Sequence, residues 1–165
     1  MKRLTHERLL ELLNYDPDTG VFTWRVFTSS RTAAGSVAGT IKQDGYISIK
    51  IEGELFRANR LAWFYMTKKW PSFLIDHANT LRSDNSWVNL REASKSDNGF
   101  NRGPQRNNSV GFKGVYQRKD NGKFSATIWK SGKKMPLGCF DTPEEASDAY
   151  AKAANMVAGD FARVS

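Results

Sequence analysis

The sequence has a single cysteine and no long apolar run. Because Cys139 is alone among 165 residues, an intramolecular disulfide and a cysteine-rich zinc site are both excluded. We expect Cys139 to be a small buried residue in a strand. No apolar run approaches the roughly 20 residues that span a bilayer, and the start at Met1-Lys2-Arg3 leads into a short amphipathic helix rather than a secretory segment. We therefore expect a cytoplasmic protein without membrane contact.

Acidic residues are too few to balance the basic ones. The chain has 25 Lys and Arg against 17 Asp and Glu, which leaves a formal net charge of +8. Such an excess favours a polyanionic partner, although charge alone does not distinguish DNA from RNA or an anionic membrane. The length suits one or two small domains.

Polar side chains with catalytic potential gather in the middle of the chain. Asp76 and Asn98 offer the oxygen donors that Mg²⁺ prefers, and one or two protein ligands suffice because phosphate and water complete its octahedron. His77, with an ordinary pKa of about 6.5, can take a proton from water. Adjacent side chains on a strand point to opposite faces, so Asp76 and His77 bracket one phosphate only if the strand ends or twists there.

The same segment has the pattern of two strands and a helix. An apolar strand is expected over residues 73–75, followed by a loop over 79–85 that is rich in Asn, Ser and Asp. A second short strand is expected over 90–93, and a polar helix begins near Ser94. The predicted unit is a ββα hairpin.

This segment resembles the HNH endonuclease family, in the His-Asn-Asn variant of phage homing endonucleases. The resemblance extends from about residue 59 to residue 101 and implies that His77 is the general base. It implies that Asn89 braces the loop between the strands, and that Asp76 and Asn98 hold one divalent metal, Mg²⁺ or Mn²⁺. The implied catalytic residues are thus His77, Asn89 and Asn98, with no small-molecule organic cofactor. Four signatures carry the resemblance: Ile75-Asp76-His77, Ser83-Asp84-Asn85, Asn89-Leu90-Arg91 and Ser96-Asp97-Asn98.

One position departs from the family pattern. Members often carry histidine before Arg-Leu, where this chain has Asn59 before Arg60-Leu61. Because the expected base and metal ligands lie further on, we expect activity to survive with one supporting contact altered. Two alternatives stay open. In one, His77 only tethers a loop and the asparagines are turn and cap residues. In the other, the chain is a DNA-binding regulator whose nuclease unit is weak or inactive.

The residues before this segment indicate a helix and antiparallel hairpins. A short helix is expected over 4–13, ending before a turn at 16–20, and a strand over 21–24. The alternating run at 46–51 lies between glycine-containing turns and suggests hairpins. Residues 58–67 are expected to form a helix whose aromatic side chains pack in the core.

A polar stretch separates two expected domains. Residues 102–109 cannot bury a core, so we expect an HNH endonuclease domain over 1–101, a linker, and a second domain over 110–165. Arg102 and Arg106 in the linker are candidate contacts to a phosphate backbone, although a solvated linker is the simpler interpretation.

The last segment is expected to form a three-stranded antiparallel sheet and one helix. Strands are expected over 114–118, 124–129 and 135–140, with turns between them. Thr142-Pro143-Glu144-Glu145 combines an N-cap, a proline at the first helical position and a capping-box glutamate, so a helix starts there. Basic residues gather in the sheet and acidic ones on the helix, which leaves the other sheet face available for a DNA groove.

The second unit contains a set of short motifs spread over nearly its whole length: Gly114-Val115, Gln117-Arg118, Gly122-Lys123-Phe124, Leu137-Gly138, Phe140-Asp141-Thr142 and Glu144-Glu145-Ala146. In these residues it resembles the APETALA2-type DNA-binding domain, known in plant ethylene-response factors and appended to phage HNH nucleases. Because Tyr116 and Pro136 stand where plant domains usually have arginine and tryptophan, the plant recognition sequence does not carry over. Arg118 is the best candidate for a bidentate guanine contact. The alternative is a lysine-rich face made only for solubility. The implied DNA contacts are Tyr116, Arg118, Lys123, Ser125, Thr127, Trp129 and Lys134.

The expected fold is therefore α+β. An N-terminal helix and β-hairpins lead into a ββα-metal (HNH) motif at about 72–101, and a three-stranded antiparallel sheet packed on one helix follows. The expected protein is a metal-dependent HNH endonuclease of homing type, phage-encoded and monomeric, which acts on double-stranded DNA. A lone HNH site cuts one strand per encounter, so we expect nicks. An RNA-binding protein is a third hypothesis, but the chain has no aromatic RNA-stacking signature of the common RNA modules.

Overall fold

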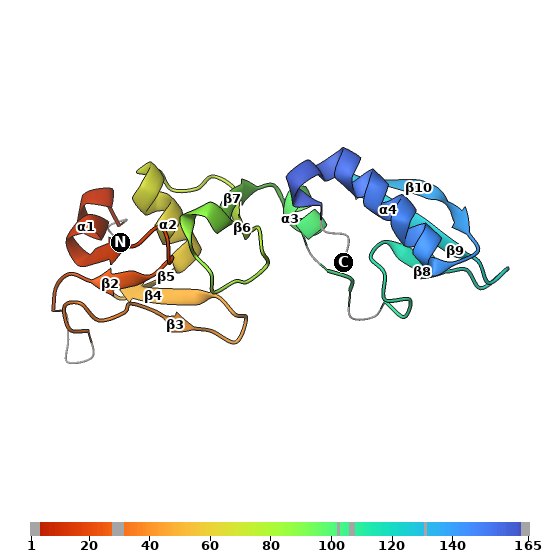
Figure 1. Cartoon of the computed structure of the whole chain (residues 1–165). Coiled ribbons are helices and arrows are strands. Elements are labelled where there is room, and N and C mark those ends of the chain that lie inside the picture. Colours follow the sequence, from red (N-terminus) through yellow and green to blue (C-terminus); the bar gives the residue numbers. More distant parts are fainter. Residues whose placement is uncertain (1–3, 28–31, 102, 106–107, 131, 163–165) are drawn as a thin grey trace. The chain divides into compact units, whose positions relative to one another are not determined.

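The computed structural model describes residues 4–27, 32–101, 103–105, 108–130 and 132–162. Within them the chain is α+β, with four α-helices and several small antiparallel sheets (Figure 1). The fold divides into two compact units, Met1–Ala93 and Ser94–Ser165. No helix in the described ranges is long and apolar enough to cross a membrane.

The first unit starts with helix α1 (His6–Leu12), strand β1 (Leu13–Tyr15) and strand β2 (Phe22–Trp24). The Thr5 side chain caps α1 by accepting a hydrogen bond from the Arg8 backbone nitrogen at 3.2 Å. The helix ends one residue before the predicted position, because Leu13 pairs with Trp24 in the β1–β2 hairpin and is fully buried. The sequence pattern did not reveal β1, which lies directly against the end of the helix.

A three-stranded antiparallel sheet and a second helix complete most of the core of this unit. Its strands are β3 (Thr40–Ile41), β4 (Ile47–Ile51) and β5 (Glu54–Arg57). Helix α2 (Ala58–Thr67) follows β5 directly and has the bounds that its apolar pattern predicts. Ile49 and Ile51 of β4 belong to one buried cluster with Leu61 and Phe64 of α2. This cluster supports the strands that follow.

Strands β6 (Leu74–His77) and β7 (Leu90–Ala93) form an antiparallel pair. The loop between them ends in the 3-10 helix η1 (Trp87–Asn89). Ile75 and Leu90 are buried in the same cluster as α2, which anchors the pair to the core. The register places Asp76 opposite Arg91 and His77 opposite Leu90.

The second unit consists of helix α3 (Lys95–Asn101), a three-stranded sheet, helix α4 (Pro143–Ala158) and the 3-10 helix η2 (Gly159–Phe161). The strands are β8 (Val115–Gln117), β9 (Phe124–Lys130) and β10 (Lys133–Phe140), antiparallel in the order β10-β9-β8. Helix α4 lies along one face of this sheet (Figure 1). The predicted capping box is confirmed, because Thr142 and Glu145 bond reciprocally at the start of α4.

Helix α3 belongs to the second unit by its contacts. Phe100 of α3 is buried with Ile128 of β9 and Tyr150 of α4. The two compact units therefore divide at residues 93 and 94, whereas the composition predicts a domain ending at residue 101. The two strands of the expected ββα hairpin thus lie in the first unit and its helix in the second. The predicted domain limits stay a prediction.

Cys139 lies in strand β10 as predicted, but it is exposed, so the prediction that it is buried is wrong. The register of β10 against β9 shifts at a bulge between Pro136 and Gly138. The shift places Cys139 opposite Ser125, on the face away from α4. Without the bulge it would lie opposite Phe124, whose side chain packs on the α4 side. A single inserted residue therefore decides which face carries the thiol.

Candidate active site

His77 is the last residue of β6 and is almost fully buried, with an exposed fraction of 3%. Its Nε2 lies 3.3 Å from Oδ1 of Asn85. The Nδ2 group of Asn85 donates to the Ser83 carbonyl at 3.2 Å, so the amide oxygen is the atom that faces the imidazole. The assigned tautomer therefore has its proton on Nε2, which donates to Asn85, and Nδ1 is the basic nitrogen.

Asn85 is held by residues far away in the sequence. The Tyr15 hydroxyl donates to the Asn85 carbonyl at 2.7 Å, and burial raises the pKa of Tyr15, which keeps that hydroxyl protonated. Gly20 packs directly on the Asn85 backbone, since a Cβ there would lie 2.2 Å from the Asn85 carbonyl carbon. The imidazole is thus oriented through Asn85 by the β1–β2 hairpin. The sequence places Asn85 in the Ser83-Asp84-Asn85 signature, but no local signal marks its contact with His77.

The environment of His77 favours its neutral form. Burial lowers the pKa of His77 below its ordinary 6.5, while the hydrogen bond to Asn85 and the charges of Asp76 and Asp84 partly oppose this effect. A neutral imidazole is the form that accepts a proton in general base catalysis.

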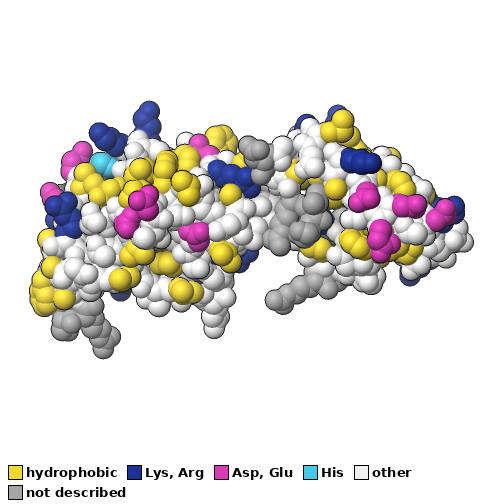
Figure 2. Space-filling view, in the orientation of Figure 1, with side chains coloured by type: hydrophobic (Ala, Val, Ile, Leu, Met, Phe, Trp, Pro, Cys, Tyr) yellow, Lys and Arg dark blue, Asp and Glu magenta, His cyan; other side chains and the backbone are white. Residues whose placement is uncertain are grey.

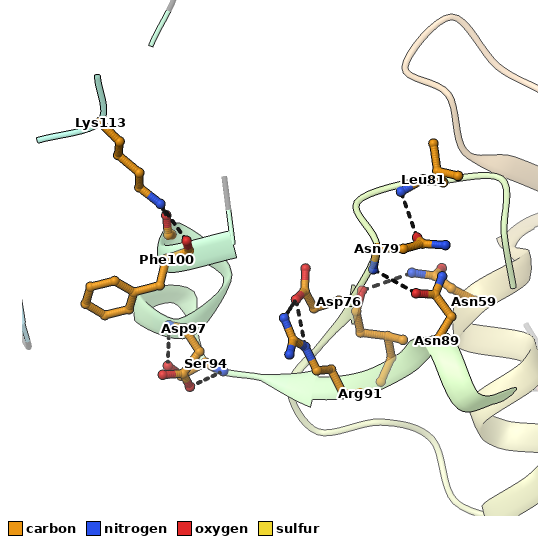
Figure 3. Close-up of polar contacts among 12 residues, drawn as sticks. Asn59, Asp76, Asn79, Leu81, Asn89, Arg91, Ser94, Asp97, Phe100 and Lys113 are labelled. Atoms are coloured by element: carbon orange, nitrogen blue, oxygen red, sulfur yellow. Dashed lines mark hydrogen bonds and ion pairs between the residues drawn. The ribbon is translucent and has the colours of Figure 1, made fainter. Parts of the chain in front are cut away.

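Asp76 precedes His77 in β6, and consecutive side chains of a strand leave on opposite faces. Its Oδ2 accepts hydrogen bonds from Nε and Nη2 of Arg91 at 3.1 and 3.0 Å (Figure 3). The Asp76 side chain is 7% exposed. The ion pair follows from the β6–β7 register and fixes the orientation of the carboxylate. Sequence reasoning did not assign this role to Arg91, although Arg91 lies within one of the family signatures.

The donor set of this region suits a hard divalent cation. Asp76 supplies a carboxylate, and magnesium sites of this kind need only one or two protein ligands. No group of three or more His, Cys, Asp or Glu that could hold a metal occurs among the described residues. Such a group is not required when phosphate and water complete the coordination, so Asp76 fits the predicted metal.

Asn98, the other predicted metal ligand, lies in α3 of the second unit. Its backbone nitrogen donates to the Ser94 carbonyl at 3.0 Å, and α3 begins with reciprocal hydrogen bonds between Ser94 and Asp97 (Figure 3). Asp76 and Asn98 therefore do not meet within one compact unit. Their joint metal site and the ββα-metal arrangement stay predictions.

Asn89 connects the two ends of the loop between β6 and β7. Its Oδ1 accepts from the Asn79 backbone nitrogen at 2.9 Å (Figure 3). Its Nδ2 donates to the Asp84 carbonyl at 2.8 Å. Asn79 in turn donates to the Asp84 carboxylate at 2.6 Å. These contacts hold the residues that precede Asn85. The catalytic role assigned to Asn89 stays a prediction.

Asn59 also contacts the strand that carries Asp76. It is 3% exposed, and its Nδ2 donates to the Ile75 carbonyl at 3.1 Å (Figure 3). The asparagine therefore joins α2 to β6 one residue before Asp76. A hydrogen-bond donor is present at the position where HNH family members often carry histidine.

The outer face of the second sheet carries several predicted DNA contacts. Tyr116 and Trp129 are 45% and 58% exposed. Lys134 pairs opposite Trp129 in the register, and its Nζ lies 5.5 Å from the centre of the Tyr116 ring. Thr127 is partly exposed, whereas Ser125 is buried. Arg102 and Arg106 lie outside the described residues.

The helix side of this unit has the opposite charge. Figure 2 shows acidic side chains gathered over α4. Glu144, Glu145 and Asp148 of α4 are exposed. The two faces of the unit therefore differ in charge, and the sheet face is the one suited to a polyanion.

Arg118 and Lys123 already have acidic partners. Arg118 donates from Nε and Nη2 to the two carboxylate oxygens of Asp120, and Nζ of Lys123 lies 2.8 Å from Asp141. Ion pairs as exposed as these are weak, so DNA phosphates or bases can replace the carboxylates. A bidentate guanine contact by Arg118 requires this exchange.

A comparison with known protein families matches residues 56–100 to the model of the HNH endonuclease family. The match begins in β5 and ends in α3, so it includes all the residues that the sequence predicts for catalysis and metal binding. The match supports the interpretation of this segment as an HNH nuclease domain.

Proposed function

We propose that this chain is a metal-dependent HNH endonuclease that hydrolyses phosphodiester bonds in double-stranded DNA. The observation that carries the proposal is the buried His77–Asn85 pair at the end of β6, inside the segment that matches the HNH endonuclease family. A histidine base needs a defined tautomer and a neutral ring, and this site supplies both. HNH nucleases generally use divalent metal ions and act on DNA.

His77 acts as the general base. Its Nε2–H is held by Asn85, so Nδ1 takes the proton from the attacking water. The charges of Asp76 and Asp84 favour the imidazolium that forms. Asp76 and Asn98 would hold Mg²⁺ or Mn²⁺, which would supply Lewis-acid stabilisation of the negative charge that develops during phosphodiester hydrolysis. Arg91 orients the Asp76 carboxylate.

Residues 110–165 are proposed to direct the nuclease to its target as an APETALA2-type DNA-binding domain. The support is a three-stranded sheet with α4 on one face and the exposed aromatic side chains of Tyr116 and Trp129 on the other. Tethering to a weak catalytic domain raises its local concentration on the target. This arrangement suits a phage-encoded homing endonuclease that acts as a monomer in the host cytoplasm and nicks one strand per encounter. The rival proposal is a DNA-binding regulator whose nuclease unit is weak or inactive, and its sequence support is Asn59. Asn59 still joins α2 to β6 through its hydrogen bond to the Ile75 carbonyl.

Metal removal tests the nuclease directly. Supercoiled plasmid and phage genomic DNA are incubated with the protein and Mg²⁺ or Mn²⁺, and agarose gels separate nicked, linear and supercoiled plasmid. We expect nicked plasmid that disappears when EDTA is added, because the bound cation stabilises the transition state by several kcal/mol. Cleavage that persists in EDTA would contradict the mechanism. Binding without any cleavage of either DNA would favour the regulator.

Alkylation of Cys139 tests the proposed DNA face. The thiol is exposed opposite Ser125. The hydrogen bonds to Ser125 and Arg118 lower its pKa, so it reacts readily. As the single cysteine of the chain, it is modified alone by N-ethylmaleimide. We expect the bulky adduct to weaken binding to duplex DNA, measured by fluorescence anisotropy. The Cys139→Ser variant is the control, because it has no thiol for N-ethylmaleimide to modify. If the alkylated protein binds duplex DNA with unchanged affinity, DNA does not bind to this face.

A further inference from the structure

Two arginines surround the ring of Tyr46 beside the predicted catalytic base. The Cζ atom of Arg57 lies 4.0 Å from the centre of that ring, and Cζ of Arg82 lies 5.1 Å from it. The Tyr46 ring itself lies 5.7 Å from the His77 ring, inclined at 59°. Tyr46 is therefore a common neighbour of the imidazole and of both guanidinium groups, all within the first compact unit.

One turn holds both arginines in place. The Asp44 carboxylate accepts a hydrogen bond from Nη2 of Arg57 at 2.9 Å, and the Asp44 carbonyl accepts one from Nη1 of Arg82 at 2.8 Å. The backbone nitrogen of Tyr46 donates to the other Asp44 oxygen at 3.2 Å. Stacking on the ring and bonding to Asp44 order both side chains in advance, so less conformational entropy is lost when they bind a ligand.

The cluster keeps binding capacity and positive charge. The Arg57 side chain is 47% exposed, and Arg82 is exposed as well. A guanidinium has five N–H donors in a planar fork, so a single bond from each to Asp44 leaves donors for a further acceptor. Only Arg57 is paired with the Asp44 carboxylate, because Arg82 bonds to the Asp44 backbone carbonyl. The Asp84 side chain accepts its hydrogen bonds from Asn79 and Ser86.

We propose that Arg57 and Arg82 form a phosphate-binding site that positions the DNA strand beside His77. This inference rests on the proposed nuclease function. Guanidinium forks match the oxygen atoms of backbone phosphates, and a strand that brings its scissile bond to His77 must pass its neighbouring phosphates over the adjacent surface. The arginines bind the backbone and take no part in proton transfer. Tyr46 is a positioning residue that acts through them.

Salt dependence of DNA binding tests the phosphate contacts without requiring cleavage. Binding of the full chain to duplex DNA is measured in EDTA over a range of salt concentrations. Each lost phosphate contact should make the slope of log K against log salt shallower by about 0.9. Arg57→Gln and Arg82→Gln should each show this change, and the double variant about twice as much. Each single change should also weaken binding by about tenfold.

The matched control is Arg8→Gln. Arg8 is an arginine of the same unit with an exposed fraction of 46% and ion pairs to Glu11 and Glu52. Its removal takes away the same charge and should leave the slope unchanged. A double variant of Arg57 and Arg82 with the slope of the unmodified protein would overturn the proposal. An absence of cleavage in every variant would count against the nuclease, while the binding slopes still decide the role of the arginines.

Conservative variants separate positioning from folding. Tyr46→Leu loses the stacking surface and should raise the KM for DNA cleavage more than it lowers kcat. Tyr46→Phe keeps the ring and should rescue most of this increase in KM. Arg82→Lys keeps the charge and should retain the salt slope, but it should lose affinity because the fork is gone. A lower Tm together with unchanged salt slopes would show a purely structural cluster and contradict the proposal.

Discussion

Replacing His77 with alanine is expected to lower the rate of metal-dependent DNA cleavage by about two to four orders of magnitude. The change removes the imidazole whose Nε2 is bonded to Asn85, and with it the group that takes the proton from water. Because binding involves other residues, the affinity for duplex DNA measured in EDTA should stay close to that of the unmodified protein. Single-turnover cleavage of supercoiled plasmid with Mg²⁺ measures the loss.

His6 provides a matched control for this experiment. It is the other of the two histidines of the chain, and its Nε2 contacts the Tyr65 carbonyl at 2.9 Å in the first unit. His6→Ala should cleave DNA at the rate of the unmodified protein. Undiminished cleavage by His77→Ala would exclude His77 as the base and return it to the role of a loop tether.

The pH dependence of cleavage should reflect the burial of His77. Burial lowers the pKa of His77 below its ordinary 6.5, and the neutral ring is the active form. The rate should therefore rise with pH and reach its plateau at a lower pH than an ordinary histidine allows. The contribution of His77 to the free energy of unfolding also increases with pH. It is fully present above about pH 6.5 and is lost as the pH falls through the lower pKa that His77 has in the folded protein. A rate profile whose apparent pKa is at or above 6.5 would contradict this environment.

Replacing Gly20 with alanine is expected to lower the free energy of unfolding by about 2 kcal/mol or more. Gly20 has a φ of +72°, where a side chain is strained, and its Cβ would lie 2.2 Å from the Asn85 carbonyl carbon. Because the obstacle is backbone, a rotamer change cannot relieve the clash. Asn85 must move, and His77 loses its hydrogen-bond partner. We therefore expect slower cleavage as well, measured at a temperature where the variant stays folded.

The Gly35→Ala variant separates the strain of a positive φ from the clash with Asn85. Gly35 has a similar φ of +82°, but a Cβ there would meet no atom of the described residues within 4 Å. This control should show only the conformational cost of about 1–2 kcal/mol and unchanged cleavage. Chemical denaturation followed by circular dichroism compares the two variants. Equal losses of stability, with full activity in both, would rule out a role for Gly20 in supporting Asn85.

The sequence alone determined the elements whose signals are local. The apolar pattern of residues 58–67 predicted helix α2, and the capping box at Thr142 and Glu145 predicted the start of α4. It also identified the segment that matches the HNH endonuclease family. Helix periodicity and capping depend on residues within a few positions of one another, so they can be recognised along the chain.

The tertiary structure decided the surroundings of the candidate base. The contact of Gly20 with Asn85 and the neighbourhood of Tyr46 and His77 join residues far apart in the sequence. The face occupied by Cys139 depended on one bulge. Such features follow from packing and strand register, which depend on all the contacts of a unit at once, so the pattern around any one of these residues does not contain them.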